Sequence, residues 1–168
     1  LRRRALARIE TSWVEIEASR MMESALFRVR MYALKLGCIL QVAADSGKGR
    51  TNLLKQAQRE IKKLARESLP FARAHAALFA ASVAEMRGKT QQALTLCEKA
   101  CAHYDQAEMP HRLFCARRRH GQLLGGRAGN ALIKDADTSL RNLSIANPAR
   151  WTAAIAPGFD NPDLTGLI

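Results

Sequence analysis

The sequence predicts an all-α protein in which seven or eight antiparallel helices form hairpins that stack as a superhelical array. Three intervals between a glycine and a proline predict it, namely 49–70, 88–110 and 126–148, and they recur roughly every 40 residues. Each interval holds one helical pattern, and each stretch from a proline to the next glycine holds another. Few residues are β-branched, and alanine and leucine dominate the apolar set, which favours helix packing over sheets.

The composition indicates one folded unit. Hydrophobic residues make up 48 % of the 168 residues, which is too many for a disordered chain. No apolar run reaches the roughly 18 residues that a membrane span needs, so we expect a cytoplasmic protein that makes no membrane contact. Because the chain starts at Leu1 without an initiator methionine, we interpret it as a fragment of a longer protein or a processed piece.

Two helices are predicted before the first glycine-rich turn, at residues 5–20 and 22–44. In the first, Ala5, Ile9 and Trp13 recur every three or four residues and so share one face. Residues 45–49 end the second helix with turn chemistry. They follow a helix and lack the longer glycine spacing of a phosphate-binding loop, so we expect an ordinary turn.

The next helix follows Gly49, with Thr51 or Asn52 as its N-cap. Its outer side carries a basic stripe, for which a solvated face is the commoner explanation. The stripe consists of Lys55, Arg59, Lys62, Lys63 and Arg66.

Residues 71–87 form an alanine-rich helix that is apolar nearly all round, which predicts a helix enclosed by its neighbours. We expect Ala80 and Ala81 to mark a tight helix contact. Gly88 ends this helix as a left-handed cap, and Thr90 begins its partner.

Two further helices are predicted around the Gly125–Gly126 turn, followed by a short helix at 151–155. The predicted domain spans residues 1–159, with repeats at 22–70, 71–110 and 111–148. From residue 157 onward we expect an extended or frayed end, with 160–168 as the C-terminal tail.

The four cysteines all lie within apolar helical patterns and are interpreted as buried free thiols. Cys97 and Cys101 stand near His103 and His111, but no CxxC pair occurs, so we predict no metal and no cofactor. Catalysis needs converging polar groups. The acidic residues are scattered in ordinary helix charge pairs, so we predict that the chain is not an enzyme.

The helix pairs resemble tetratricopeptide repeats. The small residues Ala80 and Ala81, the turn at Gly88, and Ala93 and Ala100 in the second helix match that family's pattern. In the next repeat the pattern has arginines at 118 and 119, where small residues are usual. The resemblance implies a recognition module whose concave groove is lined by the first helix of each pair.

A narrower resemblance covers the last third of the chain. Residues 120–126, 131–132, 136–137, 147–150 and 156–159 look like the carboxy-terminal ends of large bacterial signalling proteins. In those proteins a serine/threonine kinase domain or a signalling ATPase module precedes a long helical repeat tail. The resemblance implies that this chain is such a tail.

If this register holds, His75, Leu78 and Ser82 face the groove from one repeat. Ala116 and His120 face it from the next, with Arg112 and Arg119 near its rim. We therefore take His75, Ser82, Arg112, Arg119 and His120 as candidates for partner binding.

The net charge of +12 favours an acidic partner. Residues 109–134 contain six basic residues and no acidic one, so we expect this basic segment to dock onto an acidic surface. An acidic peptide or another domain of the parent protein is the expected partner. Nucleic acid is the alternative, although the aromatic residues fall mostly in core positions and leave few stacking platforms.

Overall fold

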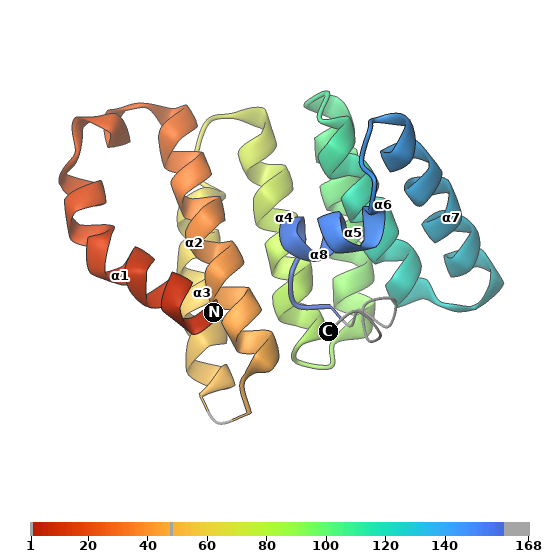
Figure 1. Ribbon diagram of the computed structural model, residues 1–168, viewed down its shortest axis with the longest axis horizontal. Helices are drawn as coiled ribbons and strands as arrows, with labels where there is room; N and C mark the ends of the chain where they lie inside the picture. Colours follow the sequence, from red (N-terminus) through yellow and green to blue (C-terminus); the bar gives the residue numbers. More distant parts are fainter. Residues whose placement is uncertain (1, 48, 160–168) are drawn as a thin grey trace.

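The structure, a computed structural model, describes residues 2–47 and 49–159. Within those ranges it contains helices and no strand, so the all-α prediction and its count of seven or eight helices are confirmed there (Figure 1). The elements are α1 (Arg2–Ala18), the 3-10 helix η1 (Arg20–Glu23), α2 (Ala25–Asp45), α3 (Arg50–Leu64), α4 (Pro70–Glu85), α5 (Thr90–Gln106), α6 (Pro110–Leu124), α7 (Gly126–Asn142) and α8 (Pro148–Ile155).

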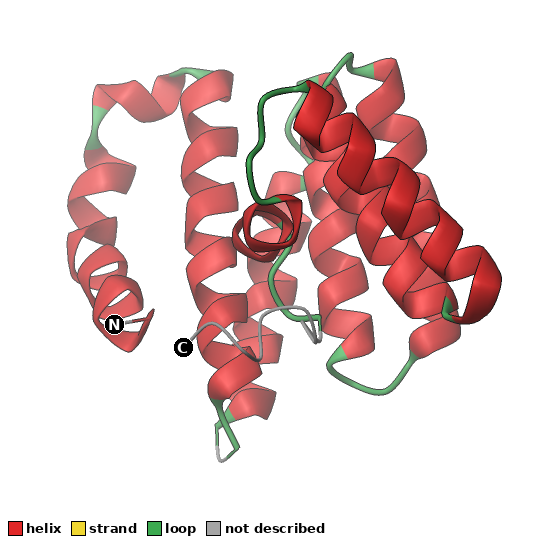
Figure 2. Ribbon diagram, turned by 45° about the vertical axis from the view of Figure 1, so that its right-hand side comes forward, coloured by secondary structure: helices red, strands yellow, loops and turns green. Residues whose placement is uncertain are grey.

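The helices pack in consecutive pairs. Helix α2 packs on α3, α4 on α5, and α6 on α7, and neighbouring pairs meet through α3 with α4 and through α5 with α6. Figures 1 and 2 show the pairs side by side in sequence order, with the two helices of each pair running in opposite directions. The α2–α3 pair lies within the range 22–70, whereas α4 and α6 each begin one residue before the ranges 71–110 and 111–148. The tetratricopeptide-like superhelix stays a prediction.

Glycine and proline have separate roles at the junctions. Gly88 has a φ of 71°, the left-handed conformation that glycine adopts without steric cost, and it ends α4 as predicted. Pro70, Pro110 and Pro148 are the first residues of α4, α6 and α8. At that position the missing N–H is not needed and the fixed φ suits a helix. The prolines therefore begin helices, and they do not close the preceding repeat.

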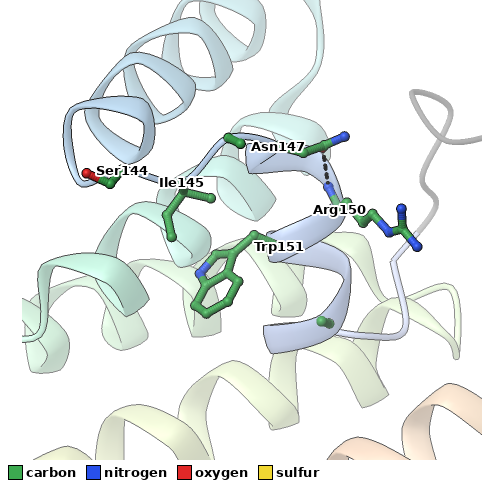
Figure 3. A pocket seen from close by; sticks show the side chains of 7 residues that line it. Ser144, Ile145, Asn147, Arg150 and Trp151 are labelled. Carbon is green, nitrogen blue, oxygen red and sulfur yellow. Dashed lines mark hydrogen bonds between the residues drawn. The ribbon is translucent and has the colours of Figure 1, made fainter.

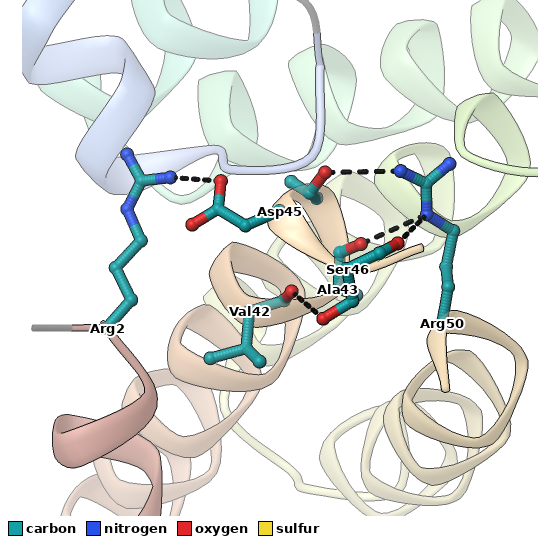
Figure 4. Close-up of polar contacts among 7 residues, drawn as sticks. Arg2, Val42, Ala43, Asp45, Ser46 and Arg50 are labelled. Carbon is teal, nitrogen blue, oxygen red and sulfur yellow. Dashed lines mark hydrogen bonds and ion pairs between the residues drawn. The ribbon is translucent and has the colours of Figure 1, made fainter. Parts of the chain in front are cut away.

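Arg50 closes the end of α2. Its guanidinium donates to three main-chain carbonyl oxygens of residues 43–46, at 3.0–3.2 Å (Figure 4). The last carbonyls of a helix lack partners within the helix, and the arginine bonds to three at this end, including that of Ala43, which also accepts from the Ser46 N–H. Helix α3 begins at Arg50 itself with Gly49 as its N-cap, and the prediction of Thr51 or Asn52 as the cap is wrong.

Helix α4 lies at the centre of the fold. Ten of its side chains are buried, among them Ala74, Leu78, Phe79 and Ala81, as the nearly all-round apolar pattern predicted. Small side chains let neighbouring helices approach, so α4 contacts α2, α3 and α5 at once.

Helices α6 and α7 touch through their main chains at Gly121 and Gly129. A Cβ atom on Gly121 would lie 2.7 Å from the carbonyl oxygen of Gly129, and one on Gly129 would overlap the carbonyl oxygen of Gly121. The small residues of this repeat therefore stand at 121 and 129, and the arginines at 118 and 119 lie beside the contact.

Helix α1 is held by charge as much as by apolar contact. The ammonium of Lys35 lies over the ring of the buried Trp13 of α1 in a cation–π contact, with Nζ 3.7 Å from the ring centroid. Lys35 Nζ also lies 3.5 Å from Glu60 Oε1. Lys63 Nζ lies 3.5 Å from Glu60 Oε2 and 3.8 Å from Glu17 Oε1. We call these five residues the N-terminal joint.

Candidate functional site

The five candidate residues lie on two first helices of the pairs. His75 and Ser82 are on α4, and Arg112, Arg119 and His120 are on α6. Three of them are buried: His75 is 4 % exposed, and Ser82 and Arg119 are 0 % exposed. The expectation that His75 and Ser82 face an exposed groove, with Arg119 near its rim, is therefore wrong. The chain itself covers Ser82 and Arg119, and His75 packs against Tyr104 of α5.

Residues 156–159, here called the closing segment, cover the face of α4 and α6. Ala156 lies in a buried cluster with Leu78 of α4 and Ala116 of α6, two residues predicted to face the groove. Figure 1 shows α8 crossing in front of α4 and α5, with the chain then running on toward the C-terminus. Residues 157–159 are non-helical, as the predicted extended or frayed end allows, but Pro157 and Phe159 are buried and so do not fray; residues 160–168 lie outside the described residues.

Gly158 fits against α4 because it has no side chain. Its φ is 92°, and a Cβ atom there would overlap Met86 Cε and lie 3.2 Å from Ser82 Cβ. Ser82 therefore contributes to the site as a packing surface for Gly158. Its hydroxyl donates to the Leu78 carbonyl at 3.2 Å and is not presented to solvent.

Phe159, the last residue of the closing segment, contacts Arg119 of α6. Phe159 belongs to a buried cluster with Ala81 and Cys97. The guanidinium carbon of Arg119 lies 5.0 Å from the Phe159 ring centroid, within the range of a cation–π contact. Arg119 Nε donates to the Ala156 carbonyl at 3.0 Å, and Nη1 donates to Gln122 Oε1 at 2.7 Å. Arg119 thus binds the closing segment through its main chain and through its aromatic ring.

His75 is part of the core between α4 and α5. Its Nδ1 lies 2.6 Å from the Tyr104 hydroxyl, and both side chains are buried. Burial, aided by the positive charge of Arg112, lowers the pKa of His75 to about 3. The imidazole is therefore neutral at physiological pH, and its Nδ1 shares a hydrogen bond with the Tyr104 hydroxyl. His75 therefore packs α4 against α5 and is not available to a partner.

Arg112 and His120 are the two candidates that stay partly exposed. His120 Nε2 lies 3.5 Å from Glu98 Oε1 of α5. The charge of Arg112 acts with burial to lower the pKa of His75, and it opposes part of the rise that burial causes in the pKa of Tyr104. These two residues flank the closing segment's face and are the candidates that remain within reach of a partner.

Fewer basic side chains of residues 109–134 are free to contact a partner than the charge of this segment predicted. Arg118 is buried, and its Nε donates to Asp137 Oδ1 at 2.7 Å across the α6–α7 contact. With Arg119 turned toward Ala156, two of the six basic residues act inside the fold. The sequence window from 109 to 134 ends just before Asp137, which is why it suggested an uncompensated charge.

A second feature lies beside α8. Residues 144–147, Arg150, Trp151 and Ala154 line a surface pocket of about 460 Å³. Figure 3 shows the side chains of Ile145 and Trp151 on the same side of this pocket, with Asn147 accepting a hydrogen bond from the Arg150 main chain. The site residues chosen from the sequence lie elsewhere.

The cysteines are free thiols in the structure. Burial raises the pKa of Cys97 to about 12 and that of Cys101 to about 11, so both are protonated at physiological pH. Within residues 2–47 and 49–159, no three His, Cys, Asp or Glu side chains gather as a metal site. Nor does any helix in those ranges have the length and apolarity to cross a membrane.

No family model, curated protein or solved structure matches this chain.

Sequence reasoning missed Ala156, Gly158 and Phe159 as parts of the site. Ala156 precedes Pro157, Gly158 and Phe159 follow it, and further turn residues come next, a composition that indicates a loose end. One signal was present: Phe159 is one of five phenylalanines in a chain with few aromatic residues, and it directly follows a glycine.

Proposed function

We propose that this chain is a protein-interaction and regulatory module whose face of α4 and α6 binds an extended segment of a partner. The partner is another protein or another domain of a longer parent chain. The main support is the closing segment itself, which the face holds through a main-chain carbonyl and an aromatic ring. Recognition of extended peptides uses the same two kinds of contact.

We also propose that the module is the C-terminal tail of a larger bacterial signalling protein, joined to a kinase or ATPase domain and working in the cytoplasm. This proposal rests on the resemblance of residues 110–159 described above. In it, the chain acts without catalysis or cofactor, because His75 and His120 serve helix contacts with Tyr104 and Glu98.

A peptide-display selection tests the proposed function. A random peptide library is selected against the full chain and against the Phe159→Ala variant, and enriched peptides are measured by fluorescence anisotropy. We expect peptides that bind at a 1:1 ratio and lose affinity when Arg112 is changed to Glu. Failure to enrich any binding peptide with either protein would contradict the proposal.

Binding of a polyanion such as nucleic acid is the second candidate, and the basic stripe of α3 favours it. Lys55, Arg59 and Lys62 lie on α3 at helical spacing, Arg66 follows in the turn just after the helix, and all four are exposed. Among the described residues, no ion pair or hydrogen bond involves the side chains of these four. Exposed cations spaced along a helix and the turn that follows it suit a phosphate backbone.

The salt dependence of oligonucleotide binding tests this second candidate. Changing the four stripe residues to Gln should reduce the slope of log affinity against log salt by about 3, since each phosphate contact contributes roughly 0.7. The control variant changes Lys89, Lys99, Arg127 and Arg141, which are exposed but scattered. Equal effects of the two variants would show attraction by net charge alone.

A further inference from the structure

We propose that the closing segment is an internal ligand, displaced by a partner segment that presents a small residue, a glycine and an aromatic residue in the order of Ala156, Gly158 and Phe159. This inference rests on the proposed function and specifies its partner. The occupant to which it commits is a protein segment of that chemistry.

The closing segment joins two helices that hardly contact each other. Helices α4 and α6 make few direct contacts, because α4 packs mainly against α5 and α6 packs against α7 and α5. Ala156 packs in a cluster with residues of both helices, and Phe159 packs with Ala81 of α4. A non-helical segment that lies between two helices in this way has the position of a bound peptide.

The contacts define what the face recognises. Arg119 donates to a main-chain carbonyl, which every peptide offers, and its guanidinium faces an aromatic ring three residues later. A competing segment that places a carbonyl and an aromatic ring three residues apart can therefore make the same two contacts with Arg119.

Gly158 adds a steric filter. At this position the chain passes Met86 and Ser82 so closely that a Cβ atom would overlap Met86, and the backbone has a φ of 92°. Any side chain there would meet both a clash and an unfavourable backbone conformation. A competing segment therefore needs glycine immediately before its aromatic residue.

The turn and helix that connect the closing segment to the helix pairs allow it to detach from the face of α4 and α6. Helix α8 has 8 residues and packs chiefly on α6 and α7, and the turn that precedes it is exposed at Ser144, Ala146 and Asn147. The three helix pairs are complete before this turn. An internal ligand lowers the apparent affinity of a competitor by the fraction of molecules in which the face is uncovered.

The test uses the full chain and a fluorescent peptide with the sequence of residues 147–159. The Phe159→Ala variant removes the internal anchor, and we expect it to bind this peptide roughly 100-fold more tightly than the unaltered chain does. The same peptide carrying Phe159→Ala or Gly158→Ala should not bind. A Gly88→Ala variant of the protein is the matched control, because Gly88 has a similar φ of 71° but an open environment. It should bind the peptide no better than the unaltered chain.

Helical content by circular dichroism and hydrogen exchange at residues 148–159 complete the test, with Gly158→Ala as a second releasing variant. We expect both releasing variants to keep their helices and to exchange faster only around α8. Equal peptide binding by the variant and unaltered chains, or no binding by well-folded variants, would overturn the internal-ligand proposal. Loss of helix throughout both variants would also overturn it, because the segment would then belong to the core. Enrichment of unrelated peptides in the display selection would leave the proposed function standing without this partner chemistry.

Discussion

The two ends of the molecule bury charged side chains in different ways. At the N-terminal joint, Lys35 shares Glu60 with Lys63 and also faces the Trp13 ring. At the C-terminal end, Arg118 is directed at Asp137 beside a contact between two main chains. The first arrangement spreads charge over several partners. The second places a buried charge pair where the backbone has little room to adjust, so the two ends should differ in their tolerance of substitution.

Removal of one carboxylate at each end should give the largest difference. The Asp137→Ala variant leaves the buried guanidinium of Arg118 without that carboxylate, and we expect a loss of about 3 kcal/mol in unfolding free energy. Glu60→Ala should cost less, about 1–2 kcal/mol, because Lys35 keeps its contact with Trp13. Urea denaturation measures both. A greater loss for Glu60→Ala would reverse the proposed difference between the two ends.

Two glycine-to-alanine variants test whether the backbone is more tightly packed at the C-terminal end than in α2. Gly121→Ala places a methyl group against the Gly129 carbonyl, so we expect a loss of about 2 kcal/mol. Gly37 lies within α2 with nothing within 4 Å of its Cβ position, so Gly37→Ala should instead stabilise by about 0.5–1 kcal/mol. Thermal melting of the two variants should show shifts of opposite sign. Two shifts of the same sign would contradict the backbone contact.

Acid should weaken the middle of the molecule more than either end. The folded pKa of His75 is about 3, below the ordinary value of 6.5. Its contribution to stability is therefore complete above pH 6.5 and is lost as the pH falls toward 3. At pH 5 this loss amounts to about 2 kcal/mol, at roughly 1.4 kcal/mol for each pH unit.

The His75→Gln variant provides the measurement, because glutamine can bond to Tyr104 but does not titrate. Its unfolding free energy should fall less between pH 7 and pH 5 than that of the unaltered chain. His120→Gln is the control at a partly exposed histidine and should keep the original pH dependence. An unchanged pH dependence in His75→Gln would show that another group titrates.

The smallest effect is expected at the exposed edge of the N-terminal joint. Glu17 and Lys63 are 46 % and 44 % exposed in their side chains, and their charged atoms are 3.8 Å apart. Water screens such a pair, so Glu17→Gln should change the unfolding free energy by less than about 0.5 kcal/mol. A larger loss, abolished by high salt, would mean that the joint depends on its outer charges too.

The sequence predicted the helices well because their boundaries are set locally. Gly88 and Pro110 act through their own backbone conformations, so their meaning can be read without knowing the fold. The alanine-rich pattern of residues 71–87 likewise indicated an enclosed helix before any neighbour was known.

The candidate site depended on contacts between distant parts of the chain, which the sequence does not display. Arg118 and Arg119 stand in a basic run, where exposure is the usual state of an arginine. Their partners Asp137 and Ala156 follow 19 and 37 residues later. The predicted register placed Leu78 and Ala116 on one face, and both pack in one buried cluster with Ala156. It could not show that residues 156–159 return to cover that face.

Each end of the molecule also contains one of the chain's two tryptophans. Trp13 is 7 % exposed within the N-terminal joint, and Trp151 on α8 is 39 % exposed. Indole emission moves to longer wavelength when the ring enters water, so the buried ring will shift strongly on release and the half-exposed ring more weakly. Trp151→Phe leaves a fluorescence signal from the joint alone, and Trp13→Phe leaves one from α8 alone. The order in which the two ends detach can therefore be followed in a single denaturant titration without any added label.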